Sequence, residues 1–159
     1  MKILGIDPGI AITGYGVVEI ENETPFLLEY GGIKTKKGLP KPERLRIIHS
    51  SITDIVKKHK PDIMVIELLF FNRNTKTALT VGEARGIALL VAGQNDMEVF
   101  EYTPLQVKES LTGYGRVKKN ELREMVQLEL DLEKPPKPID ASDALAIALC
   151  HYYLSGLYE

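Results

Sequence analysis

The first 33 residues alternate short apolar runs with turns. Three of these runs are rich in Val, Ile, Leu or aromatic residues, and they cover residues 2–6, 13–20 and 26–33. Each run is long enough to form a strand, and the connections between them are short. The pattern predicts three consecutive antiparallel strands, with Asp7 directly after the first and a turn at residues 21–25.

Beyond these runs, helical and strand-like patterns alternate. Leu45, Ile48, Ile52 and Ile55 recur at helical spacing, and an unbroken apolar run follows at residues 63–66. A short run of this kind is typical of a strand buried on both faces, as in a parallel sheet. The other predicted elements are a strand at 97–102, a helix starting at a capping box at Thr103, and helices at 75–92, 121–130 and 140–154.

This order of elements predicts an α/β fold. We expect a five-stranded mixed sheet, an antiparallel meander followed by parallel strands, with helices on both faces. The chain has 159 residues, of which 44% are hydrophobic. That size favours one domain over residues 1–159, and a two-lobed enzyme is not expected.

Charge and cysteine content narrow the class of protein. The net charge is −2, which by itself does not indicate a nucleic-acid-binding protein, although binding depends on where the charges lie. Cys150 is the one cysteine, so disulfides and multi-cysteine metal sites are excluded, and its apolar surroundings favour burial. The sequence shows neither a signal peptide nor an apolar run of about 20 residues. We therefore expect a soluble, cytoplasmic protein with no membrane partner.

Four acidic residues stand apart from the solvated majority. Asp7 and Glu67 close apolar strands, and Asp140 and Asp143 open the last helix on one side of it. Functional sites in open α/β sheets gather beyond the carboxyl ends of strands. Carboxylates that converge there repel one another unless a cation compensates them, and hard divalent ions with oxygen ligands do so. The pattern predicts a Mg²⁺ or Mn²⁺ site suited to phosphoryl chemistry.

Each of these carboxylates also has a purely structural interpretation. Asp7 could initiate the turn at Pro8 and Gly9. Glu67 could cap a neighbouring helix or pair with an arginine. Asp140 and Asp143 could be the N-cap and N3 residues of their helix, a role compatible with metal binding.

The sequence resembles the RuvC family of crossover (Holliday) junction endodeoxyribonucleases, which have a ribonuclease H-like fold. The resemblance covers nearly the whole chain in the right order. The motifs that carry it are ILGIDPG at residues 3–9, TGYG at 13–16, VIE at 65–67, GEARG at 82–86, FEY at 100–102, QVK at 106–108 and DASDALAIA at 140–148.

The resemblance implies a function in recombination and DNA repair. A homodimer would cut two like-polarity strands of a four-way DNA junction symmetrically, leaving 5′ phosphates and 3′ hydroxyls. The cofactor would be two Mg²⁺ ions per active site, with Mn²⁺ able to replace them. A branch-migration helicase complex would be a further partner.

The resemblance also implies roles for individual residues. Asp7, Glu67, Asp140 and Asp143 would be the catalytic metal ligands, and Asp140 occupies a position where some members carry histidine. Lys119 would be catalytic and Lys108 would lie near the DNA, although Lys118 is adjacent to Lys119. Residues implied or inferred to contact DNA are Phe70 or Phe71, Arg73, Lys76, Lys108, Arg116, Lys118 and Lys119.

Basic residues form three groups along the chain. The group around the glycine loop at 113–115 is the best DNA candidate, because it contains Lys119. The group at residues 57–60 is interpreted as a solvated helix face. A third group precedes and opens the first helix. The members are Lys34, Lys36, Lys37, Lys41, Arg44 and Arg46, then Lys57, Lys58 and Lys60, then Arg116, Lys118, Lys119 and Arg123.

Other features leave alternatives open. Gly82 and Gly86 would allow a close approach, either to the helix's own sheet or, by resemblance, to a second subunit at a two-fold interface. His49, His59 and His151 do not form a metal triad. A ribonuclease H-like enzyme acting on RNA or hybrid duplexes is an alternative function. An actin-like ATPase would need a second domain, and a non-catalytic DNA-binding module would not need the carboxylates.

Overall fold

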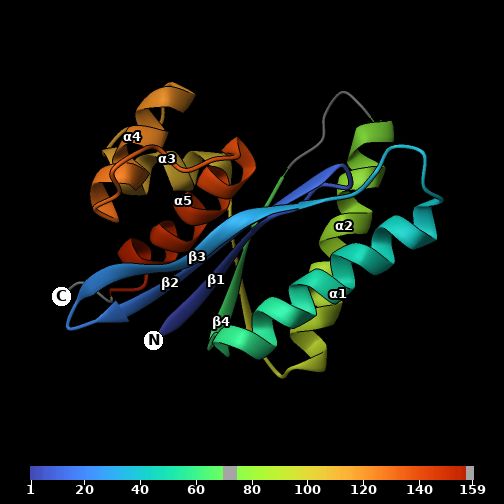
Figure 1. The fold of residues 1–159 in the computed structure, drawn as a ribbon. Coiled ribbons are helices and arrows are strands. Elements are labelled where there is room, and N and C mark those ends of the chain that lie inside the picture. The colour runs from blue at the N-terminus through green and yellow to red at the C-terminus, as the bar shows by residue number, and fades with distance from the viewer. Residues whose placement is uncertain (70–74, 157–159) are drawn as a thin grey trace.

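A computed structural model describes residues 1–69 and 75–156, which form one five-stranded mixed sheet with helices on both faces (Figure 1). The strand order is β3-β2-β1-β4-β5. The first three strands pair antiparallel, whereas β4 and β5 run parallel to β1. The strands are β1 (Lys2–Asp7), β2 (Ile12–Glu21), β3 (Thr24–Lys34), β4 (Ile63–Glu67) and β5 (Glu98–Tyr102).

The helices divide between the two faces of the sheet. Helices α1 and α2 pack on one face, and α3, α4 and α5 pack on the other (Figure 1). Their bounds are α1 (Lys41–His59), α2 (Thr75–Gln94), α3 (Pro104–Thr112), α4 (Lys119–Glu129) and α5 (Ile139–Leu154). The predicted α/β fold, a meander followed by parallel strands, is therefore confirmed.

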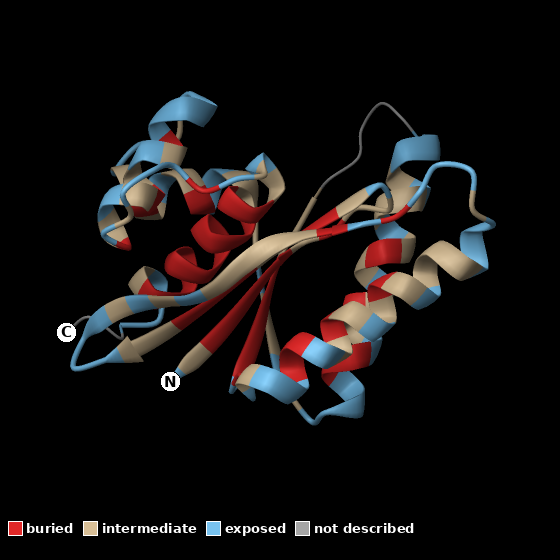
Figure 2. Cartoon of the chain, in the orientation of Figure 1, coloured by how far each residue is buried: buried red, intermediate tan, exposed pale blue. Residues whose placement is uncertain are grey.

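Two apolar cores result from this layering (Figure 2). Successive side chains of a strand point to opposite faces, so Leu4 and Ile6 enter the α1/α2 core while Ile3 enters the core under α5. Strand β4, between β1 and β5, is buried between the two layers from Ile63 to Ile66, as its unbroken apolar run predicts. Helix α5 is buried along most of its length, and Cys150 lies within it as a buried free thiol.

Local signals locate most of the helix ends. Thr103 caps α3, because its Oγ1 accepts a hydrogen bond from the Gln106 backbone at 3.2 Å, and Gln106 Oε1 accepts one from the Thr103 backbone at 2.9 Å. This is the predicted capping box. The predicted cap of α5 is wrong: Pro138 is the N-cap residue and Ile139 the first helical residue. Asp140 and Asp143 therefore do not cap the helix.

Among the helices within the described residues, none is both long enough and apolar enough to cross a membrane.

Candidate active site

Two of the four carboxylates lie side by side at the end of adjacent parallel strands. Ile6 pairs with Ile66 in the parallel ladder of β1 and β4, so Asp7 and Glu67 close their strands at the same edge of the sheet. Backbone pairing fixes this juxtaposition, because neighbouring strands lie about 4.8 Å apart. The sequence prediction that these residues share the carboxyl edge is confirmed in the fold.

Helix α5 brings the other two carboxylates to this edge by an unusually close approach to the sheet. Gly14 pairs with Asp7 across β1 and β2, and a Cβ built on Gly14 would lie 1.9 Å from the Asp140 carbonyl oxygen. A Cβ on Gly5 would lie 2.1 Å from the carbonyl oxygen of Ala144. The helix therefore rests on backbone where any larger residue would displace it. This contact sets the start of α5, and with it Asp140 and Asp143, against the end of β1.

The turn that follows Asp7 is held without the Asp7 side chain. Thr13 Oγ1 donates to the Gly9 carbonyl at 2.5 Å and accepts from the Gly9 amide at 3.4 Å. Thr13 is almost fully buried. Among the described residues, none donates a hydrogen bond to the Asp7 carboxylate, so its interpretation as a turn initiator is not supported. Sequence reasoning missed the role of Thr13, although its place four residues after Gly9 in the turn was the available signal.

The carboxylates share one electrostatic environment. Asp7 has its pKa raised to about 8, first because burial disfavours the charged form and then because Glu67, Asp143 and Asp140 repel it. The pKa values of Glu67 and Asp143 are also raised, in both cases mainly by burial. Repulsion between the converging carboxylates therefore adds to a shift that burial dominates.

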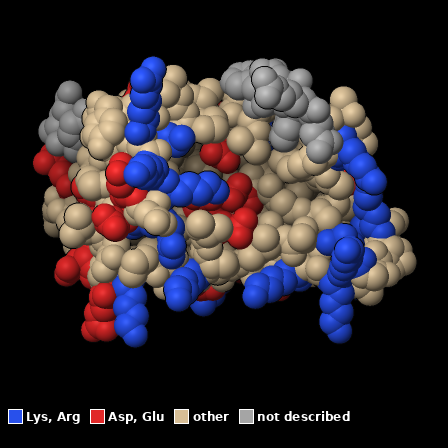
Figure 3. Space-filling view, turned by 90° about the horizontal axis from the view of Figure 1, so that it is seen from above, with Lys and Arg blue, Asp and Glu red and all other residues tan. Residues whose placement is uncertain are grey.

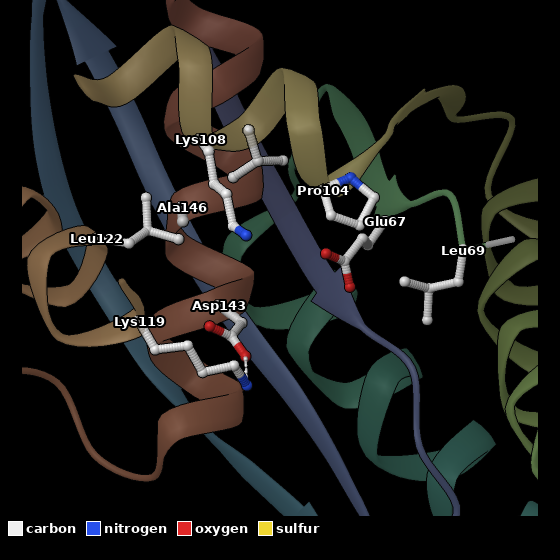
Figure 4. Close-up of a pocket in the computed structure, with 9 residues that line it drawn as sticks. Glu67, Leu69, Pro104, Lys108, Lys119, Leu122, Asp143 and Ala146 are labelled. Atoms are coloured by element: carbon white, nitrogen blue, oxygen red, sulfur yellow. Dashed lines mark ion pairs between the residues drawn. The ribbon is translucent and has the colours of Figure 1, made fainter. Parts of the chain in front are cut away.

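Two lysines oppose this negative charge. Lys119 Nζ lies 3.9 Å from Asp143 Oδ2, and its charge lowers the pKa values of Asp7, Glu67 and Asp143. Lys108 lowers the pKa of Glu67. Figure 4 shows the amino groups of both lysines and the carboxylates of Glu67 and Asp143 turned toward one cavity. Its volume is about 280 Å³, and its walls include Leu69, Pro104, Val107, Leu122 and Ala146.

The donor set fits a hard divalent cation in chemical character. All four groups are carboxylates, and a bound cation would lower the raised pKa of Asp7. The carboxylates are close enough to raise the pKa of Asp7. Within residues 1–69 and 75–156, however, no three His, Cys, Asp or Glu side chains are close enough to hold one ion. Among the described residues, Glu67 accepts no hydrogen bond from a helix end and forms no ion pair with an arginine.

Comparison with known proteins identifies the family. The family model described as crossover junction endodeoxyribonuclease RuvC matches residues 3–151. The chain belongs to the RuvC family. A RuvC from Caldicellulosiruptor saccharolyticus is 49% identical over 100% of this chain and 98% of its own length. One from Alkaliphilus oremlandii is also 49% identical, over 100% of this chain and 97% of its own.

Solved RuvC structures agree with this assignment. Thermus thermophilus RuvC in complex with a Holliday junction substrate superimposes with a TM-score of 0.92 at 36% identity, covering 98% of this chain and 94% of that one. The yeast mitochondrial Holliday junction resolvase Ydc2, at 16% identity and a TM-score of 0.67, shares the fold. The chain is therefore a RuvC-type nuclease with a ribonuclease H-like fold.

The predicted DNA-contacting residues fall into three sets. Lys108 and Lys119 lie at the cavity, and Arg116, Lys118 and Lys76 have exposed side chains. Arg123, which the sequence groups with the DNA candidates, is half-buried, and its Nη2 donates to the Pro136 carbonyl at 3.2 Å. Phe70, Phe71 and Arg73 lie outside the described residues.

The histidines occupy structural positions. His151 is buried, accepts or donates a hydrogen bond with the Tyr102 hydroxyl at 2.9 Å, and packs on the Phe100 ring. His59 ends α1, as expected, and contacts Glu29 at 2.7 Å. His49 contacts Gln94 at 2.8 Å. The three side chains belong to different contacts, which agrees with the prediction that they do not form a metal triad.

Proposed function

We propose that this protein is a metal-dependent Holliday junction resolvase that acts in recombination and DNA repair. One observation carries the proposal: in a chain of the RuvC family, the carboxyl edge of the sheet gathers four carboxylates with Lys108 and Lys119 beside a cavity. The complex of the Thermus thermophilus relative with a Holliday junction supports a four-way DNA junction as the substrate.

Asp7, Glu67, Asp140 and Asp143 would hold two Mg²⁺ ions, with Mn²⁺ able to replace them. When bound, the ions supply an activated water and stabilise the leaving 3′ oxygen in an in-line displacement at phosphorus. The products are a 5′ phosphate and a 3′ hydroxyl.

The protein's own residues contribute charge and position. Lys119 is placed to neutralise charge that develops on the scissile phosphate, because its amino group already lies among the carboxylates. Lys108, on the opposite wall of the cavity, contributes a second positive charge toward the phosphate backbone. Phe70 or Phe71 would stack on a base at the crossover, as the family resemblance implies.

A homodimer would supply the second active site that paired cleavage needs. Helix α2 carries an exposed stripe opposite its buried face: Leu79 is 66% exposed and Leu90 50%. Gly82, Gly86 and Gly93 lie on the same side, and a Cβ added to any of them meets nothing within 4 Å. The alternative that Gly82 and Gly86 pack on their own sheet is therefore wrong. If the same stripe of a second copy packed against this one, the two would form an isologous interface. A branch-migration helicase is a further proposed partner, on family resemblance alone.

The deciding experiment is cleavage of a synthetic four-way junction with Mg²⁺. We expect the wild type to cut the junction at paired sites and to leave linear duplex and RNA–DNA hybrid intact. Asp7→Asn should abolish cleavage and keep junction binding, because it removes a metal ligand and a repulsive charge together. Asp54→Asn, an exposed carboxylate on α1, is the matched control and should cut normally. Preferential cleavage of the hybrid would instead support a ribonuclease H-like activity.

A further inference from the structure

The basic segment at residues 34–46, between β3 and the first turns of α1, has no role in the site described above. Its basic side chains differ in whether they form ion pairs. Lys41 Nζ lies 3.2 Å from Glu83 Oε1, and Arg46 pairs with Glu43 on the same helix, with Nε 3.1 Å from Oε2. Arg44 forms no ion pair with any carboxylate in the described part of the chain. Its charge is therefore available to a ligand, whereas those of Lys41 and Arg46 are compensated.

Arg44 is also held in place. Its Nε donates to Thr35 Oγ1 at 2.7 Å, and Thr35 Oγ1 donates in turn to the Ile10 carbonyl at 2.5 Å. The Thr35 backbone donates to the Ala11 carbonyl at 3.1 Å, and its side chain is buried. This relay joins the guanidinium to the loop that directly follows the first catalytic strand. Among residues 1–69 and 75–156, Arg44 donates a side-chain hydrogen bond through Nε alone, so its Nη groups can face a ligand.

A groove lies beside this guanidinium. It has a volume of about 550 Å³, and it is lined by the loop at residues 9–12, by Thr35, Lys37 and Arg44, by Thr77, Thr80 and Val81 at the start of α2, and by Asp140. Asp140 thus lines this groove, while Asp143 lines the cavity with Lys108 and Lys119. The carboxylates therefore lie between the cavity, on the side of α3–α5, and the groove, on the side of α1 and α2. Figure 3 shows basic side chains on both sides of the central acidic ones.

We propose that Arg44 and Lys37 form a second phosphate site, which binds the backbone of the junction DNA where it leaves the active site toward α1 and α2. A guanidinium fixed through Nε and free at Nη suits a phosphodiester, which accepts hydrogen bonds on two oxygens. Lys37 is exposed at the same groove and adds a mobile positive charge. This inference rests on the proposed function, since it assigns more of the same substrate's path.

The test compares two arginines two residues apart. Junction binding is measured in metal-free buffer, where no cleavage occurs, across a series of salt concentrations. Arg44→Ala should weaken binding about tenfold and reduce the slope of log K against log salt by about 1, because one phosphate contact is lost. Arg46→Ala removes the same charge from a residue already paired with Glu43 and should leave both quantities unchanged.

Further variants separate contact from folding. Lys37→Ala, whose side chain is exposed, should reduce the salt slope without altering thermal stability. Thr35→Val keeps the charge of Arg44 but removes its anchor, so affinity should fall while the salt slope changes less than in Arg44→Ala. A neutral methylphosphonate placed at the contacted backbone position should abolish the difference between wild type and Arg44→Ala.

The two proposals can fail separately. If Arg44→Ala and Lys37→Ala bind as wild type does, with the same salt slope, the second phosphate site is wrong even though the wild type resolves junctions. If the wild type does not cut or bind junctions, the proposed function fails first. If both variants lose affinity for an acidic peptide rather than for DNA, the groove is an interface for a protein partner and the phosphate site is overturned.

Discussion

The ammonium group of Lys119 lies 3.9 Å from a carboxylate oxygen of Asp143, and it is the cation that all three of the raised carboxyl groups share. Lys119 opens α4, and Asp143 lies in the first turns of α5. The contact therefore ties the α4 start to the catalytic edge of the sheet. The charge of Lys119 acts on all three groups, whereas Lys108 lowers the pKa of Glu67.

Replacing Lys119 should change both rate and pH dependence. Lys119→Met removes the charge that lowers the pKa values of Asp7, Glu67 and Asp143, so these rise further and the carboxyls are protonated at higher pH. We expect junction cleavage to fall by about 10²–10³-fold. The acidic limb of the pH–rate profile should move to higher pH. Lys57→Met, an exposed lysine on α1, is the control, and an unmoved acidic limb in Lys119→Met would contradict the shared-cation interpretation.

Metal-free stability should depend on pH through Asp7. In the folded protein its pKa is about 8, against an ordinary value of 3.8, so the folded state holds the proton more tightly than the unfolded state does. The stability that this proton contributes is full below about pH 4 and is lost as the pH rises toward 8. Asp7→Asn does not titrate, so in EDTA its melting temperature should exceed that of wild type by a margin that widens between about pH 5 and 8. Equal pH dependence of the two melting curves would sink this explanation.

Divalent cations should narrow that difference in stability. Mg²⁺ or Mn²⁺ binds the folded carboxylates and relieves their repulsion, so wild-type melting temperature should rise on addition of metal at pH 8. For a chain of this size, about 1 kcal/mol corresponds to about 2–4 °C. Asp7→Asn should gain less. Differential scanning calorimetry with EDTA, Mg²⁺ and Ca²⁺ measures both effects, and a wild type that shows no shift at saturating metal would exclude a site at these residues.

The close contact between α5 and Gly14 of β2 should not tolerate an added methyl group. Gly14→Ala would put a Cβ 1.9 Å from the Asp140 carbonyl oxygen, so the start of α5 must move away from Asp7. We expect loss of junction cleavage and a destabilisation of about 1–3 kcal/mol. Gly38→Ala, where an added Cβ meets nothing within 4 Å, is the control and should cut normally. Cleavage by Gly14→Ala at the wild-type rate would show that the position of α5 does not matter for the reaction.

If the exposed stripe of α2 forms the dimer interface, a substitution there should weaken the dimer without destabilising the monomer. Gly86→Gln meets open space in the monomer and replaces a poor helix former, so monomer stability should rise by up to about 1 kcal/mol. The same side chain would separate two copies packed on this stripe, so dimer dissociation should become easier. Sedimentation equilibrium measures the association, and Lys57→Gln on α1 is the control. A dimer unaffected by Gly86→Gln places the interface elsewhere.

Local patterns in the sequence determine the elements and most of the acidic site. Hydrogen bonding along the backbone imposes the periods of helix and strand, so the apolar spacing in α1 and the unbroken run of β4 could be interpreted without knowing any distant neighbour. The capping box at Thr103 depends on residues three apart, and the structure confirms it. Asp7 and Glu67 could be predicted to share an edge because parallel strands align their carboxyl ends.

Only the tertiary structure determines how α5 contacts the sheet and which partners the basic side chains have. Gly14 and Asp140 are 126 positions apart, and their contact exists because α5 folds onto the β-meander, which no local period encodes. Lys41, Arg44 and Arg46 are basic residues of one short segment, yet they have different partners. Lys41 pairs with Glu83 on α2 and Arg46 with Glu43 on its own helix, whereas Arg44 bonds to Thr35 and pairs with no carboxylate within the described residues. Arg123 donates to the Pro136 carbonyl, a contact that its neighbours in sequence do not reveal. Charge is a property of the residue, but its availability depends on which neighbours the fold provides.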